Sequence, residues 1–301
     1  MNNTGLTIEE TILKTARSLE QGSVTFGHGT ECAEDEAAWL VLHVAGLLDA
    51  PFEEIARNAV DEALHLEIEG VVVERISSRK PLAYLFQEAW FAGIPFYIDE
   101  RAIIPRSHIG EWLSEGFEPW IIPDRVDSIL DLCTGGGSIA VASALAFPGA
   151  NVDAIDLSAE ALEVAKINRQ RYQLEQRLRL FEGDLFAPVD GHRYDLILCN
   201  PPYVSDSIMA ELPLEYRHEP PLAFSGGSLG LTLIDRLLRE AREHLTPEGT
   251  LIIEAGSASE AVNQHYPDLP FIWLTSANGE SVVFMLTAAE LEGLSSAPSH
   301  S

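Results

Sequence analysis

The sequence is poor in basic residues and in cysteine, and it has no long hydrophobic run. Its 301 residues include 19 Lys and Arg against 47 Asp and Glu, which gives a formal net charge of −28. Affinity for nucleic acid depends on Lys and Arg side chains that neutralise phosphates, so a broad phosphate-binding surface is not expected. A basic protein partner or a cationic small molecule suits this charge better, although acidity that only confers solubility is an equally simple explanation.

The three cysteines, Cys32, Cys133 and Cys199, are far apart and odd in number. They fit reduced thiols, and not a disulfide framework or a zinc site, so no metal is expected. No stretch approaches about 20 uninterrupted apolar residues, the length that a membrane-spanning helix needs. Residues 1–5 lack the basic and apolar regions of a signal peptide. These absences lead us to expect a cytoplasmic protein.

The chain is long enough for one large domain and a smaller one. Residues 1–86 are predicted to be helical, starting from a capping-box pattern at Thr7 and Glu10. Apolar residues at helical spacing predict further helices over 35–48, over 52–64 and around 71–76. Nothing in this region resembles a chemical site, so we interpret it as a module for substrate recognition or support. Aromatic segments around a turn predict a β-hairpin within a linker over 87–104.

Residues 105–290 alternate between predicted strands and helices. Such alternation implies a mostly parallel sheet that is covered by helices on both faces. The expected strands are 128–132, 152–156, 178–181, 195–199, 250–254, 271–274 and 281–286, and the main helices are 139–146, 159–172 and 231–244. The tail over 291–301 is rich in Ser and small residues and is expected to be disordered.

A glycine-rich turn follows the first strand of this region. Residues 131–138 read Asp-Leu-Cys-Thr-Gly-Gly-Gly-Ser. Glycines let the backbone approach a ligand closely, and the helix N-terminus behind them offers free N–H groups to an anion. Alone, such a turn is only a tight connection between a strand and a helix. The dinucleotide fingerprint would place glycines at 133, 135 and 138, but positions 133 and 138 are Cys and Ser, so NAD fits poorly.

Acidic residues stand at the ends of the next two strands. Asp156 is placed to accept hydrogen bonds from both ribose hydroxyls, and Asp184 is placed to contact an adenine amino group. Each acid alone is more simply a solvated strand end. Because the carboxyl ends of parallel strands meet at one edge of a sheet, their joint placement favours a site for an adenosine-like ligand.

The segment Asn200-Pro201-Pro202-Tyr203 ends the strand over 194–199. Two prolines lack N–H groups and cannot continue a strand ladder. The Asn side chain and the proline carbonyls offer acceptors, and the Tyr ring can pack against a flat group. Two acceptors aimed at one NH2 group would orient a weak nitrogen nucleophile toward an electrophilic methyl group. The simpler explanation is a strand-ending turn.

In combination, these motifs resemble the class I S-adenosylmethionine-dependent methyltransferases. The Asn-Pro-Pro-Tyr segment is similar to that of enzymes that methylate planar exocyclic or amide nitrogens. The resemblance covers roughly residues 10 to 287. It implies an α/β fold with a Rossmann-like, seven-stranded, mostly parallel sheet, here with an N-terminal helical domain and a linking β-hairpin.

Two further segments narrow the resemblance to the protein glutamine N(5)-methyltransferases. Residues 91–106 resemble the region that precedes the catalytic domain in that family. Residues 105–111, Pro-Arg-Ser-His-Ile-Gly-Glu, are similar to the subfamily that acts on large-subunit ribosomal protein L-three. The release-factor branch carries Thr-Glu where this chain has Ile109 and Gly110. His108 replaces a proline common in the subfamily, and Gly136 replaces a Ser or Thr of many relatives, but neither change removes a proposed contact.

The resemblance implies roles for individual residues. Gly135 and Gly137 would face the methionine part of the cofactor, Asp156 would hold its ribose and Asp184 its adenine. The whole implied cofactor site is Asp131, Cys133, Thr134, Gly135, Gly136, Gly137, Asp156, Asp184, Leu185 and Asn200.

The implied catalytic segment is Asn200, Pro201, Pro202 and Tyr203. The carbonyls of the Asn200 side chain and of Pro201 would accept the two hydrogens of a substrate glutamine amide, and Tyr203 would wall the amide plane. Arg106 is a further candidate for substrate binding, with a structural ion pair as an equal alternative. Glu219 is more simply a solvated loop acid.

The leading hypothesis is therefore methylation of a glutamine on ribosomal protein L-three, a basic RNA-binding protein, without a membrane or a direct nucleic-acid substrate. A release-factor glutamine methyltransferase is the second hypothesis. A nucleic-acid adenine or guanine methyltransferase is disfavoured by the acidity. A non-catalytic module that binds adenosine compounds or assists ribosome assembly remains a different class, and the retained acceptor segment counts against it.

Overall fold

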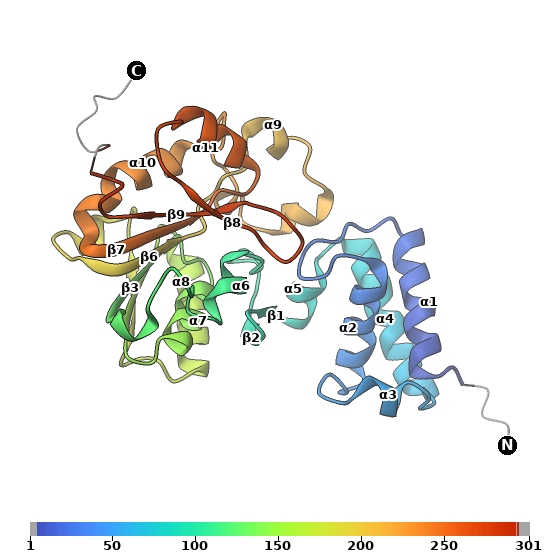
Figure 1. Cartoon of the computed structure of the whole chain (residues 1–301). Helices are drawn as coiled ribbons and strands as arrows, with labels where there is room; N and C mark the ends of the chain where they lie inside the picture. Colours follow the sequence, from blue (N-terminus) through green and yellow to red (C-terminus); the bar gives the residue numbers. More distant parts are fainter. Residues whose placement is uncertain (1–4, 293, 295–301) are drawn as a thin grey trace. The chain divides into compact units, whose positions relative to one another are not determined.

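The computed structural model describes residues 5–292 and residue 294, and it divides the chain into two compact units (Figure 1). The helical unit runs to Glu88 and also contains Pro213–His218. The other unit, called here the sheet unit, consists of Ala89–Leu212 and the chain from Glu219 onward. Within the described residues, no helix combines the length and the apolar character needed to cross a membrane.

Four helices and one short turn of helix build the helical unit. They are α1 (Ile8–Gln21), α2 (Ala33–Val44), α3 (Phe52–Ile55), α4 (Glu62–Ser78) and α5 (Leu82–Phe86). The predicted capping box is confirmed, since the Thr7 side chain accepts from the N–H of Glu10 and the Glu10 side chain accepts from the N–H of Thr7. Apolar side chains of α1, α2 and α4, such as Leu19, Leu40 and Ile68, form one core.

The prediction of one helix over 52–64 is wrong. The chain leaves the helix after α3 because Ala59 forms a β-bridge with Thr7 and the N–H of Val60 donates to Leu6. Asp61 then starts α4 by accepting a hydrogen bond from the N–H of Leu64. The apolar periodicity continued across this break, so a helix cap was misread as a helix interior.

A buried ion cluster ties Pro213–His218 to the helical unit. The fully buried Arg75 donates to Glu36 at 2.7 Å and lies 3.7 Å from the carboxylate of Glu215, which also accepts from Arg79. Burial acts to raise the pKa of Glu215, but the N–H of Thr25 and the charges of both arginines outweigh it, so the pKa is lowered.

The sheet unit begins within the predicted hairpin, β1 (Glu88–Phe91) and β2 (Ile94–Tyr97), and continues into a single larger sheet. Within the described chain this sheet has seven strands in the order β5-β4-β3-β6-β7-β9-β8, which confirms the predicted fold class. All neighbours from β5 to β7 pair in parallel, and β9 is antiparallel to both β7 and β8. The strands are β3 (Ser128–Leu132), β4 (Asn151–Asp156), β5 (Leu178–Glu182), β6 (Tyr194–Cys199), β7 (Leu245–Glu254), β8 (Ile272–Leu274) and β9 (Val283–Thr287).

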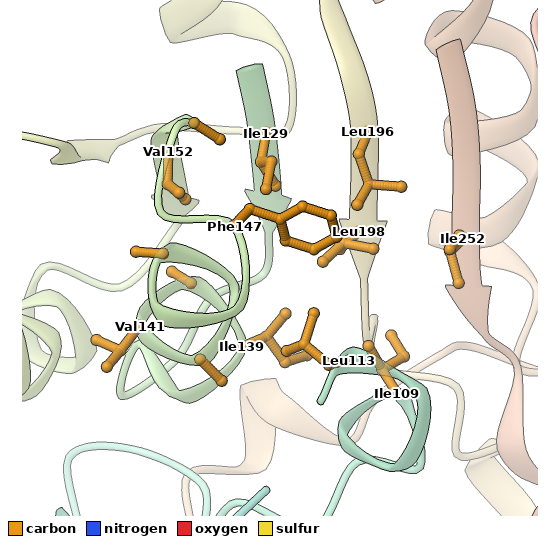
Figure 2. Close-up of a cluster of buried hydrophobic side chains, with 14 of the residues drawn as sticks. Ile109, Leu113, Ile129, Ile139, Val141, Phe147, Val152, Leu196, Leu198 and Ile252 are labelled. Carbon is orange, nitrogen blue, oxygen red and sulfur yellow. The ribbon is translucent and has the colours of Figure 1, made fainter. Parts of the chain in front are cut away.

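Helices cover both faces of this sheet because successive strand residues point to opposite sides. The helices are α6 (Ile109–Leu113), α7 (Ser138–Ala146), α8 (Ala159–Arg171), α9 (Asp206–Met209), α10 (Thr232–Glu240) and α11 (Ser259–His265). Figure 2 shows one face, where Ile139 of α7 and Leu113 of α6 pack toward Leu198 of β6. On the other face, side chains of α10 and α11 pack against strand residues such as Ile197.

The strand predictions within the sheet are all confirmed to within a few residues, with β7 starting five residues early. The predicted helix over 231–244 is α10 followed by a 3-10 turn over Ala241–His244. Most residues of the tail over 291–301, for which disorder was predicted, lie outside the described residues. So do most of residues 1–5, which were predicted to lack a signal peptide. Cys32, Cys133 and Cys199 are free thiols in the structure, and only Cys199 is buried.

Candidate active site

The strand order brings the candidate site residues to one edge of the sheet. The glycine turn follows β3, Asp156 ends β4 beside it, and Asn200 follows β6 on the other side. Leu132 pairs with Cys199, so the first residues of the glycine turn and of the Asn-Pro-Pro-Tyr segment leave neighbouring strands at the same level. The predicted convergence of strand ends is therefore present in the structure.

The glycine turn needs glycine at two of its positions. Gly135 and Gly137 have φ of +54° and +80°, in the left-handed region that side chains disfavour. A Cβ at Gly137 would also come within 3.0 Å of the Ala165 side chain in α8. The helix α7 begins directly after Gly137 with no side-chain cap, so its first N–H groups are available to a ligand.

Asp131, at the end of β3, is completely buried under this turn. One carboxylate oxygen accepts a hydrogen bond from the Thr134 hydroxyl at 2.6 Å. The other makes no hydrogen bond of good geometry to a described residue, although the backbone N–H of Ala140 lies near enough to favour the charged carboxylate. Burial, helped by the nearby charge of Asp156, raises the pKa of Asp131 to about 7. An orphaned buried acceptor beside a glycine turn fits a ligand with hydrogen-bond donors or positive charge.

Asp156 is held by the backbone on both sides. Its carboxylate accepts from the N–H of Gly135 at 2.7 Å and from the N–H of Ser158 at 2.8 Å. Burial raises its pKa, and these hydrogen bonds offset part of the effect. Each oxygen keeps one further lone pair, so the carboxylate is fixed in direction and can still accept from a ribose diol.

Asp184 and Leu185 follow β5, but only Leu185 is buried. Both carboxylate oxygens of Asp184 accept from Arg236, at 2.9 and 3.1 Å, and its side chain is 56% exposed. Contact between Asp184 and an adenine stays a prediction, and it would compete with this ion pair.

A small pocket of about 20 Å³, hardly more than a water molecule needs, lies beside the glycine turn. Its walls come from the turn and from the segment after the hairpin, and include Tyr97, Ile98, Ile103, Pro105, Thr134, Gly136, Ser138 and Asn168. The Asn168 side chain joins the two parts, since it donates to the carbonyls of Gly136 and Tyr97 and accepts from the N–H of Tyr97. Asn168 was missed by the sequence analysis, because an asparagine inside a helix carries no visible signal.

The Asn200 side chain makes no hydrogen bond to any residue that the structure describes. The Tyr203 hydroxyl, in contrast, donates to Glu254 at 2.9 Å. The backbone after Tyr203 runs beside residues 224–227. The N–H of Gly226 donates to the carbonyl of Val204, and the N–H of Val204 donates to the carbonyl of Phe224. A side chain at Gly226 would collide with the carbonyl of Pro202, so the close approach of these two segments requires glycine.

Arg106 forms a structural ion pair. Its guanidinium donates to both carboxylate oxygens of Glu219, at 2.9 and 3.0 Å, and lies 5.5 Å from the ring centre of Phe224. Glu219 is only 2% exposed and also accepts from the N–H of Ile104, so the prediction of a solvated loop acid is wrong. The ordinary solvation of loop acids was overridden by a partner 113 residues away. A role of Arg106 in substrate binding stays a proposal.

Comparison with known proteins identifies the family. The model of the methyltransferase small domain matches residues 121–212. The chain is 45% identical to the ribosomal protein uL3 glutamine methyltransferase of Burkholderia pseudomallei, over 95% of this chain and 98% of that one. It is also 45% identical to the protein of the same name from Bradyrhizobium diazoefficiens, over 90% and 88% of the two chains. This chain belongs to the ribosomal protein uL3 glutamine methyltransferase family.

Membership confirms the resemblance found in the sequence. Ribosomal protein uL3 is the large-subunit protein L-three. The protein is a class I methyltransferase and its cofactor is S-adenosylmethionine. Among solved structures, the ribosomal protein L11 methylase of Lactobacillus delbrueckii subsp. bulgaricus matches with 20% identity over 60% of this chain and 79% of that one, at a TM-score of 0.41. That score is too low to support any conclusion about the site.

The residues present fit this cofactor. Asp131 offers a buried acceptor oxygen, the glycine turn leads into the uncapped N-terminus of α7, and Asp156 presents a fixed carboxylate to a diol. No group of three or more His, Cys, Asp or Glu side chains among the described residues is placed to hold a metal ion.

Proposed function

We propose that this protein transfers a methyl group from S-adenosylmethionine to the N(5) atom of a glutamine side chain on ribosomal protein uL3. The observation that carries the proposal is the Asn-Pro-Pro-Tyr segment at the end of β6, next to the glycine turn, in a chain whose named relatives act on uL3. We propose that this ribosomal protein substrate is met in the cytoplasm and that its methylation belongs to ribosome biogenesis.

The chemistry asked of these residues is orientation. When bound, S-adenosylmethionine supplies an electrophilic methyl group on a sulfonium. The nitrogen of a glutamine amide is a poor nucleophile because its lone pair is delocalised into the carbonyl. The side-chain carbonyl of Asn200 and the backbone carbonyl of Pro201 are proposed to accept the two amide hydrogens, and Tyr203 to wall the amide plane. Placement of this kind accounts for much of the rate of such reactions.

The helical unit is proposed to recognise the substrate. We propose residues 1–86 as the recognition domain, 87–104 as a linker and 105–290 as the catalytic domain. Acidic residues outnumber basic residues by 15 to 6 over residues 1–86. This excess supports the recognition of a basic partner, because complementary charge steers association. It gives no support to a nucleic-acid substrate.

The test is methyl transfer from labelled cofactor to separate candidate substrates: purified uL3, a peptide release factor, ribosomal RNA and DNA. We expect label on uL3, at a glutamine identified by mass spectrometry. Label on the release factor or on nucleic acid instead of uL3 would contradict the proposal.

A variant pair tests the acceptor segment. Asn200→Ala is expected to abolish methyl transfer and to leave the dissociation constant of the cofactor within about twofold, because Asn200 is proposed to bind the substrate amide. The control is Asn151→Ala, which truncates an exposed asparagine at the start of β4 and is expected to keep full activity. Equal loss of cofactor binding and of methyl transfer in Asn200→Ala would instead indicate a structural role.

A further inference from the structure

A buried glutamate that the sequence analysis did not single out connects the acceptor segment, residues 200–203, to residues 107 and 108 of the sheet unit. Glu254 is the last residue of β7 and is 1% exposed. Because Cys199 pairs with Ile253, Glu254 lies at the level of Asn200, the residue that follows β6. A carboxylate taken out of water at this edge needs compensation by hydrogen bonds.

Both oxygens of Glu254 are used, and they are used by two different segments. Oε1 accepts from the Tyr203 hydroxyl at 2.9 Å. Oε2 accepts from the Ser107 hydroxyl at 2.6 Å and from the N–H of His108 at 2.8 Å. Burial still raises the pKa of the carboxyl, although these hydrogen bonds lower it in part. The carboxylate therefore has a fixed position, unlike the orphaned oxygen of Asp131.

The ring of Tyr203 is confined as well as hydrogen-bonded. Gly256, two residues beyond Glu254, has φ of +46°, and a Cβ there would overlap the Tyr203 ring. A Cβ at Gly230 would overlap the Tyr203 carbonyl oxygen. Glycines thus leave the space that the ring and its backbone fill, and the hydroxyl at the far end of the ring is bound to Glu254. These contacts leave the plane of the ring little freedom.

We propose that Glu254 is a positioning residue for methyl transfer, which orients the Tyr203 ring against the substrate amide through the Tyr203 hydroxyl. The proposal rests on the proposed function, because Tyr203 is taken to wall the amide plane. Through Ser107 and His108 the same carboxylate sets the acceptor segment against the chain just after Arg106. Glu254 itself does not touch the reacting atoms.

The experiment measures kcat and KM for uL3, the cofactor dissociation constant and the urea unfolding of the whole protein. The variants are Tyr203→Phe, Glu254→Gln and the double variant. Tyr203→Phe removes only the hydroxyl. In Glu254→Gln the amide nitrogen cannot accept a hydrogen bond. Because Ser107 and His108 both donate to Oε2, the amide oxygen is expected to take that place, and the bond that Tyr203 donates to Oε1 is lost. The matched control is Tyr194→Phe, which removes an equivalent buried bond to Asp153, 2.7 Å long, at the opposite ends of the strands.

We expect kcat to fall about tenfold in each single variant and to fall no further in the double variant, because both changes break the same link. The cofactor dissociation constant is expected to stay within about twofold, and Tyr194→Phe to keep the wild-type kcat while losing a similar amount of stability. Stability loss without a change of kcat in Tyr203→Phe would overturn the proposal. So would multiplicative effects in the double variant, or an equal loss of kcat in Tyr194→Phe.

Failure of the proposed function gives a different result. A wild-type protein that methylates the release factor but not uL3 overturns the uL3 assignment, and the same variants measured on the release factor still decide the role of Glu254. A wild-type protein that is inactive on both overturns the proposed function and the positioning role together.

Discussion

Replacing Asp131 by Asn is expected to make the cofactor-free protein more stable at neutral and alkaline pH. Asp131 is completely buried, and its pKa is raised from 3.8 to about 7. The folded state therefore binds more protons than the unfolded state between about pH 4 and pH 7, and the free energy of unfolding falls as the pH rises through this range. At 1.36 kcal/mol per pKa unit, the cost at pH 8 is about 4 kcal/mol.

Asparagine avoids this cost and keeps the shape of the side chain. Its carbonyl oxygen can still accept from the Thr134 hydroxyl, which donates to Asp131 in the wild type. Below about pH 4 the wild-type carboxyl is protonated in both the folded and the unfolded state, so the two proteins are expected to have similar stability there. By pH 5 the unfolded state is already ionised, and the variant is expected to be more stable by about 1.6 kcal/mol. At pH 8 the variant is expected to be more stable by up to about 4 kcal/mol.

Urea unfolding of both proteins between pH 3.5 and pH 8, without cofactor, measures the difference in the free energy of unfolding. The other titrating groups are common to the two proteins. The difference in the free energy of unfolding therefore reports on the ionisation of Asp131, including its repulsion with Asp156. Asp153→Asn is the contrasting control, because Asp153 is buried but accepts from both Arg179 and Tyr194. That variant is expected to lose stability at pH 8. A pH-independent difference, or an Asp131→Asn variant less stable than the wild type at pH 8, would refute the reasoning.

Two further predictions concern backbone packing and the helical unit. Gly256→Ala and Gly279→Ala both place a side chain at positive φ, but only the former meets the Tyr203 ring, so we expect it to cost about 1–3 kcal/mol more in urea unfolding and to lower kcat. Equal costs and equal kcat would count against the packing described. Glu215→Gln leaves the buried Arg75 with one carboxylate fewer and is expected to lose about 3 kcal/mol at pH 7. Because the pKa of Glu215 is lowered, this loss is expected to shrink as the pH falls toward 3, and a constant loss would contradict the assignment.

The fold was predictable because its signals are local. Apolar strands that end in glycine, acid or proline marked the carboxyl edge of the sheet, and the capping box marked the start of α1. The helix over 52–64 failed because the backbone after α3 is hydrogen-bonded to Leu6, Ile8 and Glu9, which are far away in sequence. Apolar spacing alone does not report such partners.

The site was only partly predictable for the same reason. The sequence shows that Arg106 and Glu219 are charged, but their ion pair joins residues 113 positions apart. The contact between Ser107 and Glu254 spans 147 positions. Contacts at this separation are set by the order of the strands, which emerges only when the sheet is assembled.

The acids at the strand ends differ in how their oxygens are satisfied, and this difference separates their roles. The rule that identified Asp156, an acid at the end of a parallel strand, applies equally to Glu254, so the position alone does not distinguish a ligand-binding acid from a positioning acid. Asp131 keeps a buried oxygen without a protein partner, as a residue facing a ligand would. Glu254 has both oxygens bound to protein donors, and Asp184 has both bound to Arg236. If Asp184 binds adenine, its ion pair with Arg236 must open, or Arg236 must share the carboxylate oxygens with the adenine. Asp131 could accept a hydrogen bond from a ligand without breaking an ion pair.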